Sequence, residues 1–137
     1  MSNIKTVQEI YEAFSKGDVP AIIAKLDENV NWEYDTAPNK LPWLQPLQGN
    51  QNVVKFFESL SVLEFQLFQV KEIVGDDKLV VSLLDLEVKV KHNGQIIKEI
   101  DEVHIWRFNE VGKVIAFRHR LDTQLQIQTY EIQGMQV

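Results

Sequence analysis

The sequence predicts an α+β domain in which helices pack on one face of a curved antiparallel sheet. Apolar residues at helical spacing dominate the first part of the chain, up to about residue 60, whereas alternating apolar and polar residues dominate from Glu64 onward. Glycine, asparagine and aspartate divide the alternating part into consecutive strands. Helices followed by such a run of strands are typical of a sheet whose helices all lie on one side.

Two short helices are expected at the start of the chain. The first, over about 5–16, ends at Gly17, a residue that readily adopts the conformation found after a helix. The second, over about 19–27, can be capped by Asp18. Their apolar residues at helical spacing are Val7, Ile10, Tyr11, Phe14, Ile22, Ile23 and Leu26.

A short strand and a proline-rich loop precede a third helix. The strand is expected over about 30–34, where apolar and polar residues alternate. The loop after it carries Trp43 between prolines and is long enough to form a pocket rim or lid. The third helix, over about 51–60, presents Phe57 on its apolar side.

The second half of the chain predicts four long strands, over about 64–74, 78–91, 96–108 and 113–122. Asn93-Gly94 between the second and third strands is a strong signal for a two-residue hairpin turn. Asn109–Gly112 joins the third and fourth strands. The tail from Gln124 has mixed periodicity, which fits either a strand or a helix.

The turn at Asn93-Gly94 predicts the register of the first long hairpin, because loop length fixes which residues pair. A two-residue turn places Asp85 opposite Glu102 and Leu83 opposite His104. The inward face of this hairpin then combines apolar residues with carboxylates.

A four-residue turn predicts the register of the last hairpin, with Glu102 opposite His119 and His104 opposite Phe117. The resulting inward face is apolar at one end and carries histidine and carboxylate groups at the other. Its expected cross-strand rows are Val81-Trp106-Ile115, Leu83-His104-Phe117 and Asp85-Glu102-His119.

The opposite face of the sheet is expected to be too apolar in its middle to face water. It would hold the even-numbered residues of 80–90 with Val103 and Ile105, and Arg118 and Asp122 as structural or interface residues. A second subunit covering this face is the simplest explanation, so we expect a homodimer through the outer sheet face.

Composition limits the partners and the location. The net charge is −6 and no basic stripe is present, which argues against nucleic acid and against an anionic membrane surface as partners. The chain of 137 residues has no cysteine, no apolar core of a signal peptide near its start and no stretch long enough to span a membrane. We therefore expect one cytoplasmic domain over residues 1–137.

Several short sequence motifs, spread over about residues 5–123, resemble those of a known protein family. They are Tyr11-Glu12-Ala13-Phe14 before Gly17-Asp18, Val30-Asn31-Trp32-Glu33, Gly49 before Phe56-Phe57, Trp106-Arg107-Phe108-Asn109, Gly112-Lys113-Val114, Arg118 and Asp122-Thr123. In this order the chain resembles the SnoaL-like proteins of the polyketide-cyclase and ketosteroid-isomerase-like superfamily. The resemblance implies a cone-shaped half-barrel, often dimeric, with three N-terminal helices on the concave face and a deep pocket between helices and sheet. It does not select a reaction, because the family includes isomerases, cyclases, dehydratases, epoxide hydrolases and binding domains.

The catalytic groups of the steroid isomerases in this superfamily are not kept. Their first-helix tyrosine corresponds to Ile10, with Tyr11 one position further around the helix. Their aspartate base corresponds to Tyr34, and their second oxyanion donor corresponds to His104. The resemblance therefore implies only that Tyr34 and His104 line the pocket.

The strongest candidate for a catalytic pair is Glu102 with His119. A neighbouring carboxylate raises the pKa of a histidine and fixes its tautomer. The alternative interpretation is an ordinary cross-strand ion pair. The leading hypothesis is a cofactor-free isomerase, cyclase or dehydratase that transfers protons on a small apolar or aromatic substrate. His104 and His119 would be acid and base, Glu102 would orient them, and Tyr34 would donate a hydrogen bond. The expected substrate-binding residues are Trp32, Trp43, Phe57, Asp85, Trp106 and Phe117.

The same residues allow two alternatives to this hypothesis. A non-catalytic ligand-binding or assembly module of the same fold would have a small or self-filled pocket. A metal site is not expected, because neither a His-x-His nor a His-Glu-x-x-His spacing occurs. No cofactor is expected either.

Overall fold

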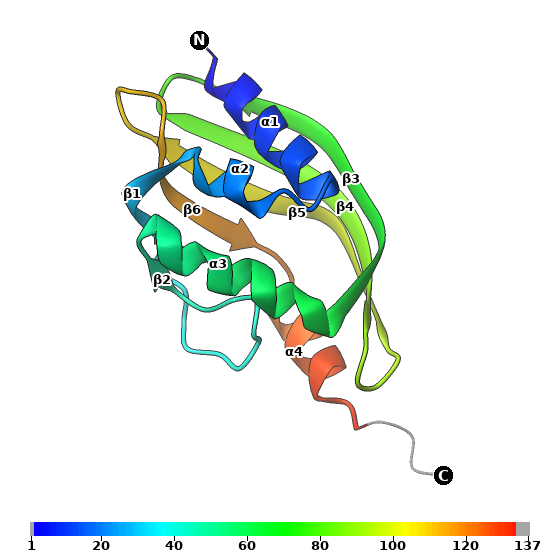
Figure 1. Cartoon of the computed structure of the whole chain (residues 1–137). Helices are drawn as coiled ribbons and strands as arrows, with labels where there is room; N and C mark the ends of the chain where they lie inside the picture. The colour runs from blue at the N-terminus through cyan, green and yellow to red at the C-terminus, as the bar shows by residue number, and fades with distance from the viewer. Residues whose placement is uncertain (1, 134–137) are drawn as a thin grey trace.

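The computed structural model describes residues 2–133 and shows helices lying over one face of a curved sheet (Figure 1). The helices are α1 (Asn3–Ser15), α2 (Val19–Ile23), α3 (Asn50–Ser59), the short 3₁₀ helix η1 (Leu60–Val62) and α4 (Thr123–Glu131). The strands are β1 (Leu26–Trp32), β2 (Leu47–Gln48), β3 (Leu63–Gly75), β4 (Leu79–Val90), β5 (Ile96–Phe108) and β6 (Val114–Arg120). The predicted α+β class is confirmed.

The six strands form one sheet in the order β2-β1-β6-β5-β4-β3. The neighbours pair antiparallel, except that β1 pairs parallel with β6, so the sheet is mixed and the expectation of a wholly antiparallel sheet was wrong for this pair. A parallel pair requires a long crossover, and here the chain from α3 through β5 supplies it. This arrangement brings the end of β1 beside β6.

The tail that the sequence left undecided forms α4 up to Glu131, and residues 134–137 lie outside the described part of the chain. The Asp122 side chain caps the start of this helix by accepting from the backbone N–H of Leu125 at 3.0 Å. At the other end, the Asn93 side-chain amide donates to the carbonyl of Thr129 at 3.0 Å and to that of Ile132 at 2.8 Å. Contacts with the β4–β5 loop therefore hold α4, which explains why its own weak periodicity did not predict it.

The register predicted from Asn93-Gly94 was wrong. Lys89 pairs with Ile96, and the Gly94 N–H donates to the Val90 carbonyl, so the connection is a wider loop. A β-bulge then follows in β5, where Asp101 has φ 59°. The loop and the bulge together leave the rest of the hairpin one residue away from the predicted pairing.

This difference of one residue reverses the two faces of β4. Ser82 lies opposite His104 and Leu84 opposite Glu102, and the even-numbered residues of β4 are buried under the helices rather than on the outer face. Asp85 points outward, where it forms an ion pair with Lys71 at 2.8 Å.

The second hairpin also carries a bulge, at Ile115. Its side chain is 39% exposed instead of facing the core. Beyond the bulge Trp106 pairs with Phe117 and His104 pairs with His119. The predicted rows are therefore replaced, and the two histidines become direct cross-strand neighbours.

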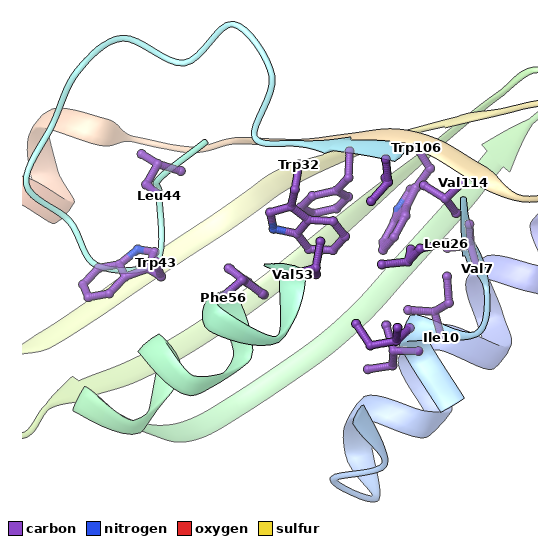
Figure 2. Close-up of a cluster of buried hydrophobic side chains, with 14 of the residues drawn as sticks. Val7, Ile10, Leu26, Trp32, Trp43, Leu44, Val53, Phe56, Trp106 and Val114 are labelled. Carbon is purple, nitrogen blue, oxygen red and sulfur yellow. The ribbon is translucent and has the colours of Figure 1, made fainter. Parts of the chain in front are cut away.

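Aromatic side chains form much of the core between helices and sheet. Trp32 stacks on Phe117 with ring centroids 4.0 Å apart, and its ring centroid lies 5.2 Å from that of Phe56. Figure 2 shows Trp32 between Phe56 of α3 and Trp106 of β5, with Val7 and Ile10 of α1 further along. These rings also line a pocket between the helices and the sheet.

Candidate functional site

The pocket lies between the helices and the inward face of the sheet, and its wall is almost entirely apolar. The cavity volume open to the centres of water molecules is about 80 Å³. By the same measure one water needs roughly 10–15 Å³, so the pocket has room for several waters or a small molecule. Polar groups gather among the aromatic rings of the wall: Tyr11, Glu102, His104, His119 and Gln126. An apolar pocket with a few converging polar groups is typical of small-molecule sites.

His119 of β6 is paired with Glu33, a residue that sequence reasoning missed. Glu33 follows β1 with φ 57°, and its fully buried carboxylate bonds to Nδ1 of His119. The backbone N–H of His119 donates to the same carboxylate at 3.0 Å. Burial alone would lower the pKa of His119, but the charge and hydrogen bond of Glu33 outweigh it, so the pKa is raised.

His104 of β5 is paired instead with Glu102, two residues earlier on the same face of the strand. Its Nε2 lies 2.8 Å from the Glu102 carboxylate, and its Nδ1 lies 2.6 Å from the Tyr11 hydroxyl. Burial lowers the pKa of His104, and the bond to Glu102 only partly opposes it. Burial would raise the pKa of Glu102, but the His104 bond outweighs it and the pKa is lowered. His104 is thus favoured as neutral imidazole beside an ionised Glu102.

The two histidines occupy one wall with their ring centroids 4.7 Å apart. Their pKa values are displaced in opposite directions, because His119 faces a fully buried carboxylate whereas burial dominates at His104. Neighbouring groups whose surroundings separate their pKa values are suited to act as acid and base.

Tyr11 connects this wall to α1. Its hydroxyl lies 2.7 Å from the Ser82 hydroxyl, which accepts from the Trp106 indole N–H at 3.0 Å. Burial raises the pKa of Tyr11, so the hydroxyl keeps its proton. Tyr11 was predicted to lie one helical position away from the family's tyrosine site, yet the structure brings it into the pocket.

Most of the predicted site residues line the pocket: Trp32, Trp43, Phe57, Glu102, His104, Trp106, Phe117 and His119. The predicted pairing of Glu102 with His119 was wrong, because the bulges place His119 opposite His104. Asp85 lies on the outer face, as described above.

Tyr34 lies outside the pocket, contrary to expectation. Its hydroxyl accepts from Nε of Arg107 at 3.1 Å on the outer side of the sheet. The positive φ of Glu33 breaks the strand alternation, so Glu33 turns inward where Tyr34 was expected. No sequence signal marks this reversal, apart from the position of Glu33 directly after an inward tryptophan.

A metal ion could be held by Glu102, His104 and His119, whose ligand atoms lie within 4.8 Å of one another. In the structure Nε2 of His104 is already bonded to Glu102. Coordination by all three residues would break that bond, so the geometry fits the hydrogen-bonded pair better.

Fold and pocket together define an NTF2-like protein, a class that encloses a cavity between helices and a curved sheet. The chain belongs to the SnoaL-like domain family, whose sequence profile matches residues 7–117. A sequence comparison with curated proteins gave no match.

Solved structures share this fold over nearly the whole chain. An NTF2-like protein of unknown function from Burkholderia pseudomallei is 27% identical with a TM-score of 0.80, and the match covers 96% of this chain and all (100%) of that one. TerC, co-crystallised with polyporic acid, is 21% identical with a TM-score of 0.76, covering 95% and 98%. A computationally designed 17-OHP binder is 14% identical with a TM-score of 0.69, covering 91% and 97%.

Proposed function

We propose that the protein binds a small, mostly apolar or aromatic molecule in this pocket. It would then transfer protons to and from carbon atoms of the bound molecule without a cofactor. The observation that carries the proposal is the wall on which His104 and His119, with opposite pKa displacements, lie side by side. Isomerisation, cyclisation and dehydration all need one group that removes a proton and another that supplies one.

The two catalytic pairs have different tasks. Nδ1 of His119 is bonded to Glu33, so its Nε2 is the nitrogen that can reach a bound molecule and donate a proton to it. The Glu102–His104 pair accepts a proton. Because both pairs lie on one wall, the proton leaves and arrives on the same face of the substrate, as in a 1,3-shift or a syn elimination.

Relatives of the same fold support a small-molecule ligand. TerC was crystallised with polyporic acid, and the designed protein is a 17-OHP binder. The aromatic wall here would pack against a ligand's apolar part, while the histidines and Glu102 would contact its polar end.

A screen in heavy water tests the proposal. Small aromatic ketones and alcohols that raise the melting temperature would be incubated with the protein in D₂O and followed by proton NMR. We expect at least one bound compound to exchange a C–H proton for deuterium or to be converted, at a rate above that in protein-free buffer. Binding without exchange or conversion across the panel would favour the alternative of a non-catalytic binding module.

A homodimer through the outer sheet face is proposed from Val81, Leu83, Val103 and Ile105, which lie on that face and are only partly buried in the single chain. Sedimentation at micromolar concentration is expected to give about twice the chain mass of 15.9 kDa. Val103→Glu should shift the protein to monomer, whereas Lys55→Glu on the exposed side of α3 should not. A wild-type monomer at this concentration would refute the dimer.

The cellular location and the absence of nucleic-acid and membrane partners remain predictions from composition. No helix within residues 2–133 is long and apolar enough to cross a membrane. We propose a cytoplasmic protein without a nucleic-acid partner, in line with the net charge of −6.

A further inference from the structure

The turn after β1 holds two residues in a backbone conformation that is unfavourable for any residue with a side chain. Glu33 has φ 57° and Asp35 has φ 58°, both in the left-handed region. Strained conformations of this kind persist where surrounding contacts fix them. Tyr34 lies between the two residues, so contacts made to Tyr34 determine whether the turn keeps its shape.

Arg118 of β6 reaches this turn from the outer face of the sheet. Its Nη1 donates to the backbone carbonyl of Tyr34 at 3.1 Å, and its guanidinium carbon lies 5.8 Å from the centre of the Tyr34 ring. Arg118 is 9% exposed, so bulk water does not compete freely for this contact. Among the described residues, its other polar contact is the exposed Asp35 carboxylate at 3.8 Å. The Tyr34 carbonyl is therefore its closest polar partner.

Arg107 of β5 holds the other end of the same tyrosine. Its Nε donates to the Tyr34 hydroxyl at 3.1 Å, and its guanidinium carbon lies 5.9 Å from the ring centre. Arg107 is exposed and binds the tip of the side chain, whereas Arg118 is buried and binds the backbone. Arg118 is thus the contact that can fix the backbone of the turn.

The shape of the turn decides which side of the sheet receives the Glu33 carboxylate. The backbone N–H of Glu33 donates to the carbonyl of Phe117 at 2.7 Å, which ties the start of the turn to β6. The Glu33 carboxylate then turns inward, where it accepts from the backbone N–H of His119 at 3.0 Å and bonds to Nδ1 of the same residue. Arg118 and His119 are neighbours in β6 and point to opposite faces. One strand therefore holds the turn from outside and receives its carboxylate inside.

We propose that Arg118 is a positioning residue: by holding the Tyr34 carbonyl from the outer face, it keeps Glu33 turned inward onto His119. The inference rests on the proposed function, in which His119 donates a proton and Glu33 bonds to its Nδ1. Arg118 is not among the residues that line the pocket, so it acts through the backbone of the turn. Loss of its guanidinium should then disturb the Glu33–His119 pair on the opposite face of the sheet.

The test follows the hydrogen between Nδ1 of His119 and Glu33 by NMR, in ligand-free protein with ¹⁵N-labelled histidine at pH 6. A hydrogen held by a buried carboxylate exchanges slowly with water and gives a separate signal, which is assigned by its absence in His119→Gln. Arg118→Met removes the guanidinium and keeps an unbranched side chain. We expect this signal to weaken or vanish, and the backbone N–H of His119 to exchange roughly tenfold faster, the size expected for one lost hydrogen bond.

Arg120→Met, which replaces an exposed arginine on the same strand, is the control and should leave the signal and the exchange rate unchanged. A double variant, Arg118→Met with Asp35→Gly, tests how Arg118 acts. Glycine adopts positive φ without penalty, so it should relieve the strain of the turn and restore part of the signal.

An unchanged signal and exchange rate in Arg118→Met would overturn the proposal. A loss that Asp35→Gly leaves uncorrected would also count against it, because Arg118 would then not act through the turn. If Arg118→Met does not fold, Arg118→Gln, a shorter polar side chain, takes its place and is judged by the same outcomes. No substrate is used, so a binding protein without activity would give the same result, and failure here is distinct from failure of the test of catalysis.

Discussion

Glu33→Gln is expected to lower the free energy of unfolding by about 3 kcal/mol at pH 6, which is typical of breaking a buried ion pair by removing one partner. The substitution keeps the shape of the side chain and an oxygen that can accept from the backbone N–H of His119. It removes the charge that raises the pKa of His119 above the value of an unfolded chain.

The pH dependence of this loss has a definite sign. A histidine whose pKa is raised by folding stabilises the protein fully below its unfolded pKa of about 6.5, and that stabilisation disappears as the pH rises through the folded pKa. The difference between wild type and Glu33→Gln should therefore shrink markedly between pH 6 and pH 9. Urea unfolding at both pH values measures it.

Glu110→Gln, which neutralises an exposed carboxylate in a turn, is the control and should change stability little at either pH. A loss in Glu33→Gln that is as small as in this control would show that the buried pair does not stabilise the fold. A loss of equal size at both pH values would show that His119 does not carry the charge assigned to it.

The sequence predicted the elements of this fold well because their patterns are local. Helical spacing marks α1 and α3, and alternation marks β4 and most of β5. The parallel pairing of β1 with β6 could not be predicted this way, because it joins segments that the rest of the chain separates. The helix α4 escaped prediction because contacts with Asn93 and Glu99 hold it in place.

The site was predicted in part, and the errors have a common origin. Residues on β5 were placed correctly, because Glu102, His104 and Trp106 lie at strand period within one element. Their partners depend on register, and Asp101 and Ile115 change it through bulges that no sequence signal marks. The inward turn of Glu33 depends on a single positive φ, which residue type does not announce.

Glu102→Gln is expected to lower the rate of deuterium exchange or conversion of an active compound by roughly 10²–10⁴-fold, the range for loss of a positioned acid or base. The amide retains an oxygen that can accept from Nε2–H of His104, so pocket shape and binding of the compound should change little. The exchange assay in D₂O and a binding titration with the same compound measure the two effects separately.

Tyr11→Phe supplies the comparison that identifies the base. Tyr11 touches the far nitrogen of His104, so its loss should slow the reaction much less than Glu102→Gln if the proton goes to Glu102. If His104 itself took the proton, it would take it at Nδ1 through the Tyr11 hydroxyl, which would pass its own hydrogen to Nδ1 and receive one from the substrate, and the two variants would slow the reaction comparably. Equal losses would therefore assign the role of base to His104, whereas unchanged exchange in Glu102→Gln would remove this carboxylate from the chemistry altogether.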